Sequence, residues 1–273
     1  MIKITCLSEN SVKFGTGYWA EHGLSFFVET PERNFFIDAG ASTEVLQHNL
    51  EIARLNFEDV DTLVISHGHF DHTNGLPVLL KNMKNPCIYA HPEIFAEHYA
   101  FSNEKYRYIG IQIEKETLEN MCTLNLTEKP VEIGSGIYFS GEIPRKHFRA
   151  GKFYLRTESG YVTDQIVDDA AVYLSTPAGV LVVFGCGHAG VINTLEHAKQ
   201  LTGRKIFGVF GGTHLVSASD EEIREVVEYL NAENVEIIRL SHCTGKKAEY
   251  MLQSAFGKKF AIFPCGEVEI VEF

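Results

Sequence analysis

From residue 170 onward, hydrophobic positions follow a regular alternation of short apolar runs and amphipathic stretches. The runs Ala171–Thr176 and Val180–Phe184 flank the turn Pro177-Ala178-Gly179, which predicts a β-hairpin. The expected elements that follow are a helix at 190–201, strand Ile206–Phe210, a helix at 219–230, strand Val235–Leu240, a helix at 244–254 and strand Phe260–Phe263. Strands that alternate with helices favour an α/β fold, in which helices cover the faces of sheets.

The N-terminal part of the chain carries similar apolar runs. The expected elements there are strands at 2–7, 24–30 and 35–40, a helix at 42–54 capped by Ser42 or Thr43, a strand at 62–65, a helix at 75–83 and a strand at 86–91. No internal repeat, low-complexity tract or linker interrupts the pattern. We therefore expect a single domain over residues 1–273.

Periodicity is poor between residues 92 and 129, where aromatic and charged side chains dominate. We interpret this segment as a mostly helical insertion, which either forms a lid over a site or is a plain structural excursion. Residues 134–163 then carry the signals of β-hairpins.

Composition narrows the class of protein. A chain of 273 residues with 45% hydrophobic residues is an ordinary globular protein with a sizeable core. It has neither an apolar run of membrane-spanning length nor a basic, apolar signal at its N-terminus, so we expect a cytoplasmic protein that does not enter membranes. Its six cysteines are scattered without CxxC pairs, which argues against a disulfide scaffold and a zinc ribbon.

The charge balance bears on partners. The chain has 24 basic and 36 acidic residues, a net charge of −12, and shows no obvious basic stripe. Enzymes that act on nucleic acids usually carry such a stripe, because neutralising phosphates supplies most of their affinity. We therefore expect a small-molecule substrate and no nucleic-acid partner, while the sequence leaves the oligomeric state open.

One apolar run ends abruptly in metal-binding side chains. Thr62–Ile65 is followed by Ser66-His67-Gly68-His69-Phe70-Asp71-His72, which places three imidazoles and a carboxylate within six residues. Such ligands suit a divalent metal of the zinc type, or a pair of them. A tight turn brings His67 and His69 to one ion while Asp71 and His72 face a second. Four ligand-type residues directly after a strand disfavour the alternative of a polar loop that is rich in histidine by chance.

Residues of the same kind follow four other predicted strands. They are Asp38, the pair Cys186 and His188, His214, and His242. In open α/β sheets, ligands bind beyond the carboxyl ends of the strands. Helix N-termini that point into such a site also favour a phosphate or carboxylate. We therefore expect one site at these strand ends and a small anionic substrate.

A dinuclear site needs about three protein ligands per ion and a bridging water, whose pKa falls to roughly 7. His188 and His242 are the strongest candidates to complete the two ligand sets, and Asp71 is also counted as catalytic. Cys186 competes with His188 as a ligand. Because Cys186 precedes a Gly turn, however, we expect it to lie near the ions without binding them. We expect two Zn²⁺ ions, with Mn²⁺ or Fe as alternatives.

Other residues are expected around the ions. Asp38 is placed to orient a ligand imidazole through its free N–H group. His214 is expected to donate a proton or to contact an anionic substrate. Arg145 is expected to bind a phosphate or carboxylate, with a solvated salt bridge as the alternative. His22, at the end of the long loop 10–23, is expected to contact the substrate.

The strand followed by Ser66–His72 resembles the signature of the metallo-β-lactamase superfamily, and the layout from Asp38 to His242 is similar to that superfamily over nearly the whole chain. Five further motifs resemble one branch of it: Glu21–Ser25, Gly141–Arg145, Gly185–Gly190, Gly211–Leu215 and Ser241–Gly245. That branch contains metal-dependent hydrolases and archaeal synthases that join a dihydropterin to an aminobenzene ribofuranosyl phosphate.

The resemblance implies an α/β fold, a four-layer αβ/βα sandwich of two mixed sheets with a helical insertion around 92–129. It also implies metal roles for His67, His69, Asp71, His72 and His242. The superfamily usually has a further histidine ligand in a Pro-Gly-His-type motif, whereas the nearest upstream histidine here, His147, stands in a different context. Cys186 occupies about the place of the superfamily's bridging residue and His188 follows it, so which of the two binds metal is left open.

The leading functional hypothesis is a metal-dependent hydrolase that attacks a small anionic substrate, such as a phosphate ester, with a metal-bound hydroxide. His214 would assist the leaving group. The alternative is a pterin transferase that forms a C–N bond with an aminobenzene ribofuranosyl phosphate. A metal-binding protein without turnover is the third hypothesis, and the proton-handling residues around the ions argue against it.

Overall fold

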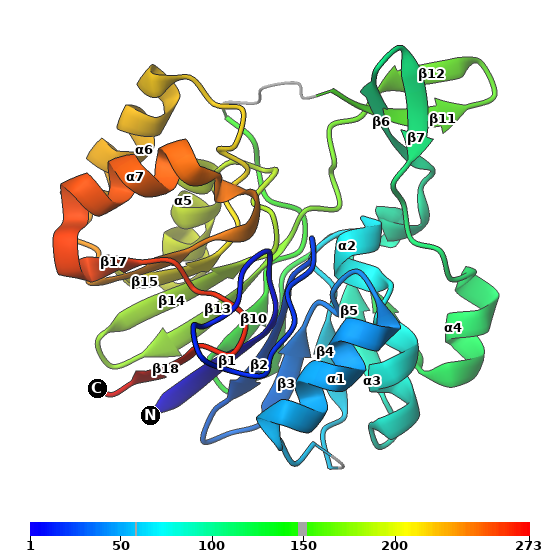
Figure 1. Ribbon diagram of the computed structural model, residues 1–273, viewed down its shortest axis with the longest axis horizontal. Helices are drawn as coiled ribbons and strands as arrows, with labels where there is room; N and C mark the ends of the chain where they lie inside the picture. The colour runs from blue at the N-terminus through cyan, green and yellow to red at the C-terminus, as the bar shows by residue number, and fades with distance from the viewer. Residues whose placement is uncertain (58, 147–151) are drawn as a thin grey trace.

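The computed structural model describes residues 1–57, 59–146 and 152–273. Two seven-stranded sheets pack face to face, and helices cover their outer faces (Figure 1). A four-stranded antiparallel sheet stands apart from this body. The predicted α/β sandwich of two mixed sheets is therefore confirmed.

The first sheet has the strand order β18-β1-β2-β3-β4-β5-β8. Its strands are β18 (Val268–Val271), β1 (Ile2–Ser8), β2 (Ser25–Glu29), β3 (Asn34–Ile37), β4 (Thr62–Val64), β5 (Cys87–Ala90) and β8 (Thr123–Leu126). Strands β18 to β3 pair antiparallel, whereas β3, β4, β5 and β8 run parallel.

The second sheet has the strand order β17-β16-β15-β14-β13-β10-β9 and is mixed in the same way. Its strands are β17 (Phe260–Ala261), β16 (Ile237–Leu240), β15 (Ile206–Gly211), β14 (Gly179–Phe184), β13 (Ala171–Thr176), β10 (Ile137–Phe139) and β9 (Val131–Gly134). Strands β14 to β17 run parallel, and β13 and β14 form the predicted antiparallel hairpin.

The helices form the two outer layers. They are α1 (Thr43–Ala53), α2 (Phe70–Thr73), α3 (Leu76–Asn82), α4 (Lys115–Met121), α5 (Val191–Thr202), α6 (Asp220–Ala232) and α7 (Lys246–Phe256), with the 3-10 turns η1 (Pro92–Phe95), η2 (His242–Thr244) and η3 (Gly257–Lys259). The side chain of Ser42 caps α1, which confirms one of the two predicted N-caps.

Three apolar cores hold the layers together. The central core lies between the two sheets and joins residues such as Phe26 and Phe35 of the first sheet to Val172 and Phe210 of the second. A second core packs α5, α6 and α7 on the outer face of the second sheet, and a third packs α1 and α3 on the outer face of the first. Strands buried on both faces read as nearly continuous apolar runs, which is why the pattern of β14 could be recognised in the sequence.

The segment 92–129 is not mostly helical, so this expectation was wrong. Besides η1 and the seven-residue α4, it contributes β8 to the first sheet and two strands, β6 (His98–Ser102) and β7 (Lys105–Tyr108), to the separate sheet. Strands β6 and β7 alternate aromatic with polar residues and are joined by Asn103 and Glu104, both with positive φ. Aromatic residues favour strands, and such a two-residue turn closes a hairpin, so these local preferences outweigh the charge-rich composition.

The separate sheet also contains β11 (Phe153–Thr157) and β12 (Gly160–Thr163), in the order β12-β11-β6-β7. It leans over one side of the strand-end region, because the ring of Phe153 lies 5.5 Å from that of His69 and 5.3 Å from that of His188.

Among the described residues, no helix is both long and apolar enough to span a membrane.

Replacing Phe35 with alanine tests the central core at a point away from the strand ends. Phe35 lies within β3 and is fully buried, so its loss leaves a cavity and should lower the free energy of unfolding by about 3–5 kcal/mol. Urea denaturation of metal-free protein measures this change. Phe14→Ala is the control, because that side chain is fully exposed and its removal should change stability by less than about 0.5 kcal/mol. Equal effects of the two substitutions would contradict the assigned core.

Candidate metal centre

The predicted site residues converge at one edge of the sandwich. Asp38 follows β3 and His67 comes shortly after β4, and these two strands are parallel neighbours in the first sheet. Cys186, His214 and His242 come after β14, β15 and β16, which are parallel neighbours in the second sheet. Because parallel neighbours end at the same edge, five segments far apart in sequence meet there.

Three of these strand-end residues have a strained backbone. Asp38, His214 and His242 have φ values of 57°, 50° and 56°, in the left-handed region that residues with a side chain rarely adopt. Such strain persists only where the surrounding structure enforces it, and it is found preferentially at functional sites.

Three imidazoles form the first group of potential metal ligands, made of His67, His69 and His188. The Nε2 atom of His67 and the Nδ1 atom of His69 lie 3.0 Å apart. Gly68 between them permits the turn, because a Cβ atom there would lie 2.2 Å from the carbonyl oxygen of Ile94.

The second group contains Asp71, His72, Cys186 and His242, all of them buried. The Oδ2 atom of Asp71 lies 3.6 Å from Nε2 of His72 and 3.4 Å from Nε2 of His242. The Sγ atom of Cys186 lies 3.2 Å from Nε2 of His72. The structure thus brings the sequence-predicted residues together in the expected grouping, with His188 beside the first pair and His242 beside the second.

Cys186 differs from its expected place. We had assigned it with Asp38 to the surroundings, but its sulfur lies among the donor atoms of the second group. His188 and Cys186 therefore no longer compete, since each is placed with a different group. His147, the other histidine that the sequence left in question, lies outside the described residues.

The Asp38 carboxylate fixes the loop 66–72, which carries four of the candidate metal ligands. One oxygen accepts a hydrogen bond from the backbone N–H of Ser66 at 2.7 Å. The other lies 2.7 Å from the Ser66 hydroxyl and 2.6 Å from Nδ1 of His72. The Nε2 atom of His72 is thereby turned towards Asp71 and Cys186, as expected of a residue that orients a ligand.

Burial and neighbouring charges set the protonation of the cluster. Burial and the adjacent imidazoles lower the pKa of His67 well below its usual value, and they lower that of His69 to about 3. Burial opposes ionisation of Asp71, but the imidazoles of His72 and His242 outweigh it and lower its pKa. Burial likewise raises the pKa of Cys186, so its thiol stays protonated unless a cation compensates the thiolate. Neutral imidazoles and an ionised carboxylate are the forms that bind metal.

The donor set fits divalent metal ions. The Nε2 atoms of His69, His188 and His242 are buried and have no hydrogen-bond partner among the described residues. A buried polar atom without a partner destabilises the fold by about 1–3 kcal/mol, and several at one point need a common explanation. Metal ions bound between the two groups would supply it, and nitrogen, oxygen and sulfur donors together favour zinc or a similar ion.

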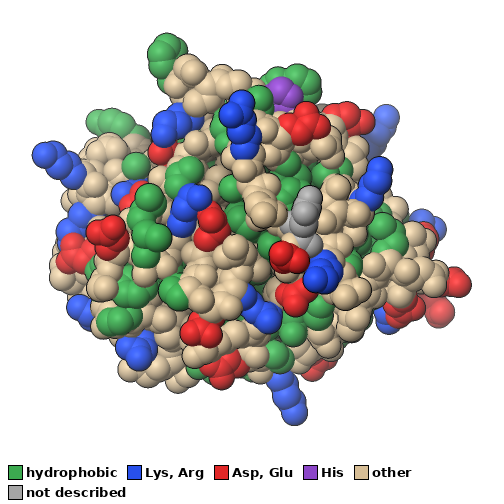
Figure 2. All heavy atoms as spheres, turned by 90° about the horizontal axis from the view of Figure 1, so that it is seen from below, with side chains coloured by type: hydrophobic (Ala, Val, Ile, Leu, Met, Phe, Trp, Pro, Cys, Tyr) green, Lys and Arg blue, Asp and Glu red, His purple; other side chains and the backbone are tan. Residues whose placement is uncertain are grey.

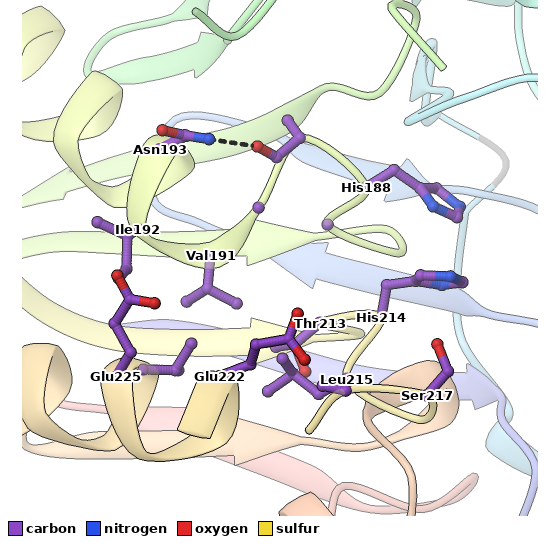
Figure 3. Close-up of a pocket in the computed structure, with 15 residues that line it drawn as sticks. His188, Val191, Ile192, Asn193, Thr213, His214, Leu215, Ser217, Glu222 and Glu225 are labelled. Atoms are coloured by element: carbon purple, nitrogen blue, oxygen red, sulfur yellow. Dashed lines mark hydrogen bonds between the residues drawn. The ribbon is translucent and has the colours of Figure 1, made fainter. Parts of the chain in front are cut away.

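A pocket of about 320 Å³ opens beside the first group, between α5 and α6 (Figure 3). His188 and His214 lie side by side at one end of it, with ring centroids 4.3 Å apart. Val191, Leu215 and other apolar side chains line its middle, and Glu222 and Glu225 of α6 line the remaining wall. The predicted His214 thus reaches both the donor cluster and an open cavity.

Arg145 and His22 lie at the edges of the cluster. The Arg145 guanidinium donates a hydrogen bond to the backbone carbonyl of Ile166 and is near enough to influence the pKa of Asp169 and His188. The His22 imidazole is mostly exposed, and its Nε2 atom lies 3.4 Å from Oδ2 of Asp71.

Sequence reasoning missed a second set of buried supporting residues. Asp168 accepts a hydrogen bond from the backbone N–H of Gly68 at 2.7 Å, in the middle of the His-Gly-His turn. His98, whose Nδ1 lies 2.6 Å from Asp164, packs edge-on against the ring of His69. Two adjacent aspartates directly before the apolar strand β13 were a signal for buried carboxylates. The partner of Asp168 lies 100 residues away, however, and no local pattern indicates it.

On the other side of the cluster, the carboxylate of Glu9 accepts a hydrogen bond from the backbone N–H of His242, and Asn10 Oδ1 lies 2.9 Å from its Nδ1. Asn10 therefore turns the His242 Nε2 atom towards Asp71. The sequence gives no sign of this pairing across 232 positions.

Comparison with known proteins agrees with this geometry. Residues 18–208 match the metallo-beta-lactamase superfamily. The chain is 30% identical, over 98% of its length and 96% of the relative's, to the 7,8-dihydropterin-6-methyl-4-(beta-D-ribofuranosyl)-aminobenzene-5'-phosphate synthase of Methanocaldococcus jannaschii. It is also 28% identical to the exodeoxyribonuclease WalJ of Streptococcus pneumoniae, over 62% of its own length and 63% of that protein.

Among solved structures, the fold matches that of Tm1679, a metal-dependent hydrolase of the beta-lactamase superfamily, with a TM-score of 0.86 and 27% identity over the whole of both chains. The match in fold thus extends over the whole chain, including the strand ends at which the donors converge. The chain belongs to the metallo-β-lactamase superfamily.

Proposed function

We propose that this protein is a metal-dependent hydrolase of a small anionic substrate, such as a phosphate ester, and that it acts at the strand-end cluster. The observation that carries the proposal is the pair of adjacent donor groups at one end of a pocket. The first group consists of three imidazoles, and the second consists of a carboxylate, two imidazoles and a thiol. The match to a metal-dependent hydrolase over the whole chain supports it.

The donor set suits two Zn²⁺ ions, with Mn²⁺ or Fe as alternatives. When bound, such ions lower the pKa of water and polarise the substrate oxygen that faces them. The protein supplies the geometry: Asp38 and Asn10 orient His72 and His242, and Asp168 holds the turn that carries His67 and His69.

The pocket indicates how a substrate lies. Its middle is apolar, and the side chains of Glu222 and Glu225 place negative charge on the α6 wall. An anionic group would be repelled there, whereas the end beside His188 faces the donor cluster. The reacting anionic group therefore belongs at His188 and His214, and an uncharged part of the substrate belongs between α5 and α6.

His214 is the residue best placed to move a proton. Burial lowers its pKa, but contact with Cys243 outweighs burial and raises the pKa above its usual value. Its buried Nδ1 atom has no hydrogen-bond partner within the described part of the chain. A protonated His214 at the end of the pocket would donate a proton to the leaving group. Arg145, near His188, would contribute positive charge to the binding of an anion.

A second candidate is the synthase activity, in which a C–N bond forms between a dihydropterin and an aminobenzene ribofuranosyl phosphate. Identity of 30% to a protein of that name over 98% of the chain favours it. The two candidates differ in their products. Incubation with a dihydropterin diphosphate and the aminobenzene acceptor yields a coupled product only if the protein is a synthase, whereas a hydrolase releases phosphate without the acceptor.

An oligonucleotide substrate is the less favoured reading. The net charge is −12, and the face seen in Figure 2 shows acidic and basic side chains interspersed, without a basic stripe. Binding to nucleic acid would require neutralisation of phosphates. Salt-sensitive binding and exonucleolytic degradation of DNA, as the name of the WalJ relative suggests, would reverse this assessment.

Alanine at His67 or Asp71 should remove turnover of 4-nitrophenyl phosphate esters by more than about a hundredfold, because each removes a donor from a different group. Initial rates and metal content per chain are measured together. His48→Ala is the matched control, since this imidazole lies outside both groups and bonds to the carbonyl of Gly17. Full activity in both cluster variants would show that the cluster is not the active site.

Removing metal with a chelator should abolish the same activity, and adding Zn²⁺ or Mn²⁺ should restore it. Elemental analysis of protein purified without chelator should give two equivalents per chain, because the donors form two groups. Activity that persists in metal-free protein would exclude the proposed chemistry.

Asp38→Asn should weaken metal binding by about tenfold to a hundredfold, because the carboxylate no longer orients His72. It should also lower the free energy of unfolding by about 1–3 kcal/mol, since buried hydrogen bonds to Ser66 are weakened. Competition with a chromogenic chelator measures the first change and urea denaturation the second. Asp59→Asn, at a carboxylate that is 92% exposed, should change neither.

A further inference from the structure

His22 is a histidine of the cluster that neither donor group includes. It stands at the end of the loop that joins β1 to β2, and its side chain is 64% exposed. From the sequence we expected it to contact substrate. Its geometry relative to Asp71 points to a different partner.

Three imidazoles surround one oxygen of Asp71. Its Oδ2 atom lies 3.4 Å from Nε2 of His22, 3.4 Å from Nε2 of His242 and 3.6 Å from Nε2 of His72. Ligand atoms about 2.0–2.2 Å from one zinc-type ion lie about 3.0–3.6 Å from each other. By this measure His22 is placed like the two buried histidines and not like a surface side chain that passes nearby.

The orientation of the ring agrees with the distance. The imidazoles of His22 and His242 are stacked, with centroids 5.1 Å apart and planes inclined by 23°. Both rings present Nε2 to the same carboxylate oxygen. An ion held by Asp71 would account for this common direction, whereas an ion pair between His22 and Asp71 would account for only one of the three contacts.

The backbone around His22 is fixed, although its side chain is exposed. The N–H group of Leu24 donates to the carbonyl oxygen of Asp71 at 3.1 Å. A Cβ atom at Gly23 would lie 2.7 Å from the backbone nitrogen of Ala41 and 2.9 Å from that carbonyl oxygen, so only glycine allows so close an approach.

On the other side of His22, the Glu21 carboxylate accepts hydrogen bonds from the hydroxyl of Ser8 at 2.7 Å, the backbone N–H of Ala41 at 2.9 Å and the hydroxyl of Ser42 at 2.6 Å. The motif Glu21-His22-Gly23 is therefore built to hold one imidazole against Asp71.

We propose that His22 is a further ligand of the ion held by Asp71, His72, Cys186 and His242. The inference rests on the proposed function, because it requires a metal ion at the second group. As a donor at the solvent face, His22 can be replaced by water or substrate without opening the core, unlike its buried partners.

The test compares wild-type protein with His22→Ala and His22→Gln, and uses His48→Ala as the control. His48 is matched because its ring also contacts the loop 10–23, at the carbonyl of Gly17, but does not face Asp71. Each protein is stripped of metal and titrated with Co²⁺. The readouts are the visible absorption of bound Co²⁺, which reports coordination number and donor type, and the affinity of each equivalent in competition with a chromogenic chelator.

Loss of His22 should lower the affinity for one of the two Co²⁺ equivalents by about tenfold to a hundredfold and change the Co²⁺ spectrum. The affinity for the other equivalent should stay unchanged. His48→Ala should behave like wild type. The melting temperature of the metal-free variants should stay unchanged, because the His22 side chain lies mostly in solvent.

Two outcomes would overturn the proposal and differ in what they imply. If wild type binds two equivalents and the His22 variants show the same affinities and spectrum, His22 is not a ligand, while the proposed function stands. An increase in KM alone in those variants would then assign His22 to the substrate. If wild type binds fewer than two equivalents, the dinuclear function itself fails, and the role of His22 fails with it.

Discussion

The carboxylate of Asp38 joins the segments on which the metal centre is built. It follows β3, binds the backbone and hydroxyl of Ser66 after β4, and contacts His72 within α2. A buried carboxylate is tolerated only when its oxygens are satisfied, and here every contact is to the metal-binding loop. Asp38 also has a positive φ, a strained conformation that persists only where the surrounding contacts enforce it.

Burial lowers the pKa of histidines in both donor groups, but the neighbouring charges differ between the groups. Around His67 and His69, burial and crowding keep the imidazoles neutral, with lone pairs available. Burial also lowers the pKa of His72, but Asp38 and Asp71 outweigh it and raise the pKa to about 9, so in metal-free protein this residue carries a charge. A metal ion bound at the second group would therefore displace a proton from His72, whereas an ion at the first group would meet neutral imidazoles.

Much of the architecture could be predicted from local pattern. Strands such as β14 are continuous apolar runs, α1 begins at a recognisable cap, and the His-x-His-x-Asp-His turn directly follows a strand. Strands β11 and β12 lie in the region where β-hairpins were predicted, whereas β6 and β7 were missed because they are short and lie in a segment rich in charged residues, although a tight turn joins them.

The residues of the candidate site also fall into those that the sequence reveals and those that only the folded chain reveals. Its candidate ligands could be recognised because histidine, aspartate and cysteine are conspicuous after apolar strands. The residues that orient them, such as Asp168 and Asn10, could not, because their partners lie 100 and 232 positions away and such pairings exist only in the folded chain. The position of the Cys186 sulfur likewise depends on how its backbone turns after β14.

The positions of the donors along the chain also determine when each donor group can be completed during synthesis and folding. The two groups draw on residues from His67 to His242, so neither is complete until both sheets have formed and packed. Contacts between such distant positions form late, because each requires closure of a long loop. A nascent chain emerging from the ribosome holds the His-x-His-x-Asp-His turn long before the residues that complete either group have been synthesised. A metal ion that requires a complete donor group would therefore bind only after both sheets have packed, through the side of the cluster that is open to solvent.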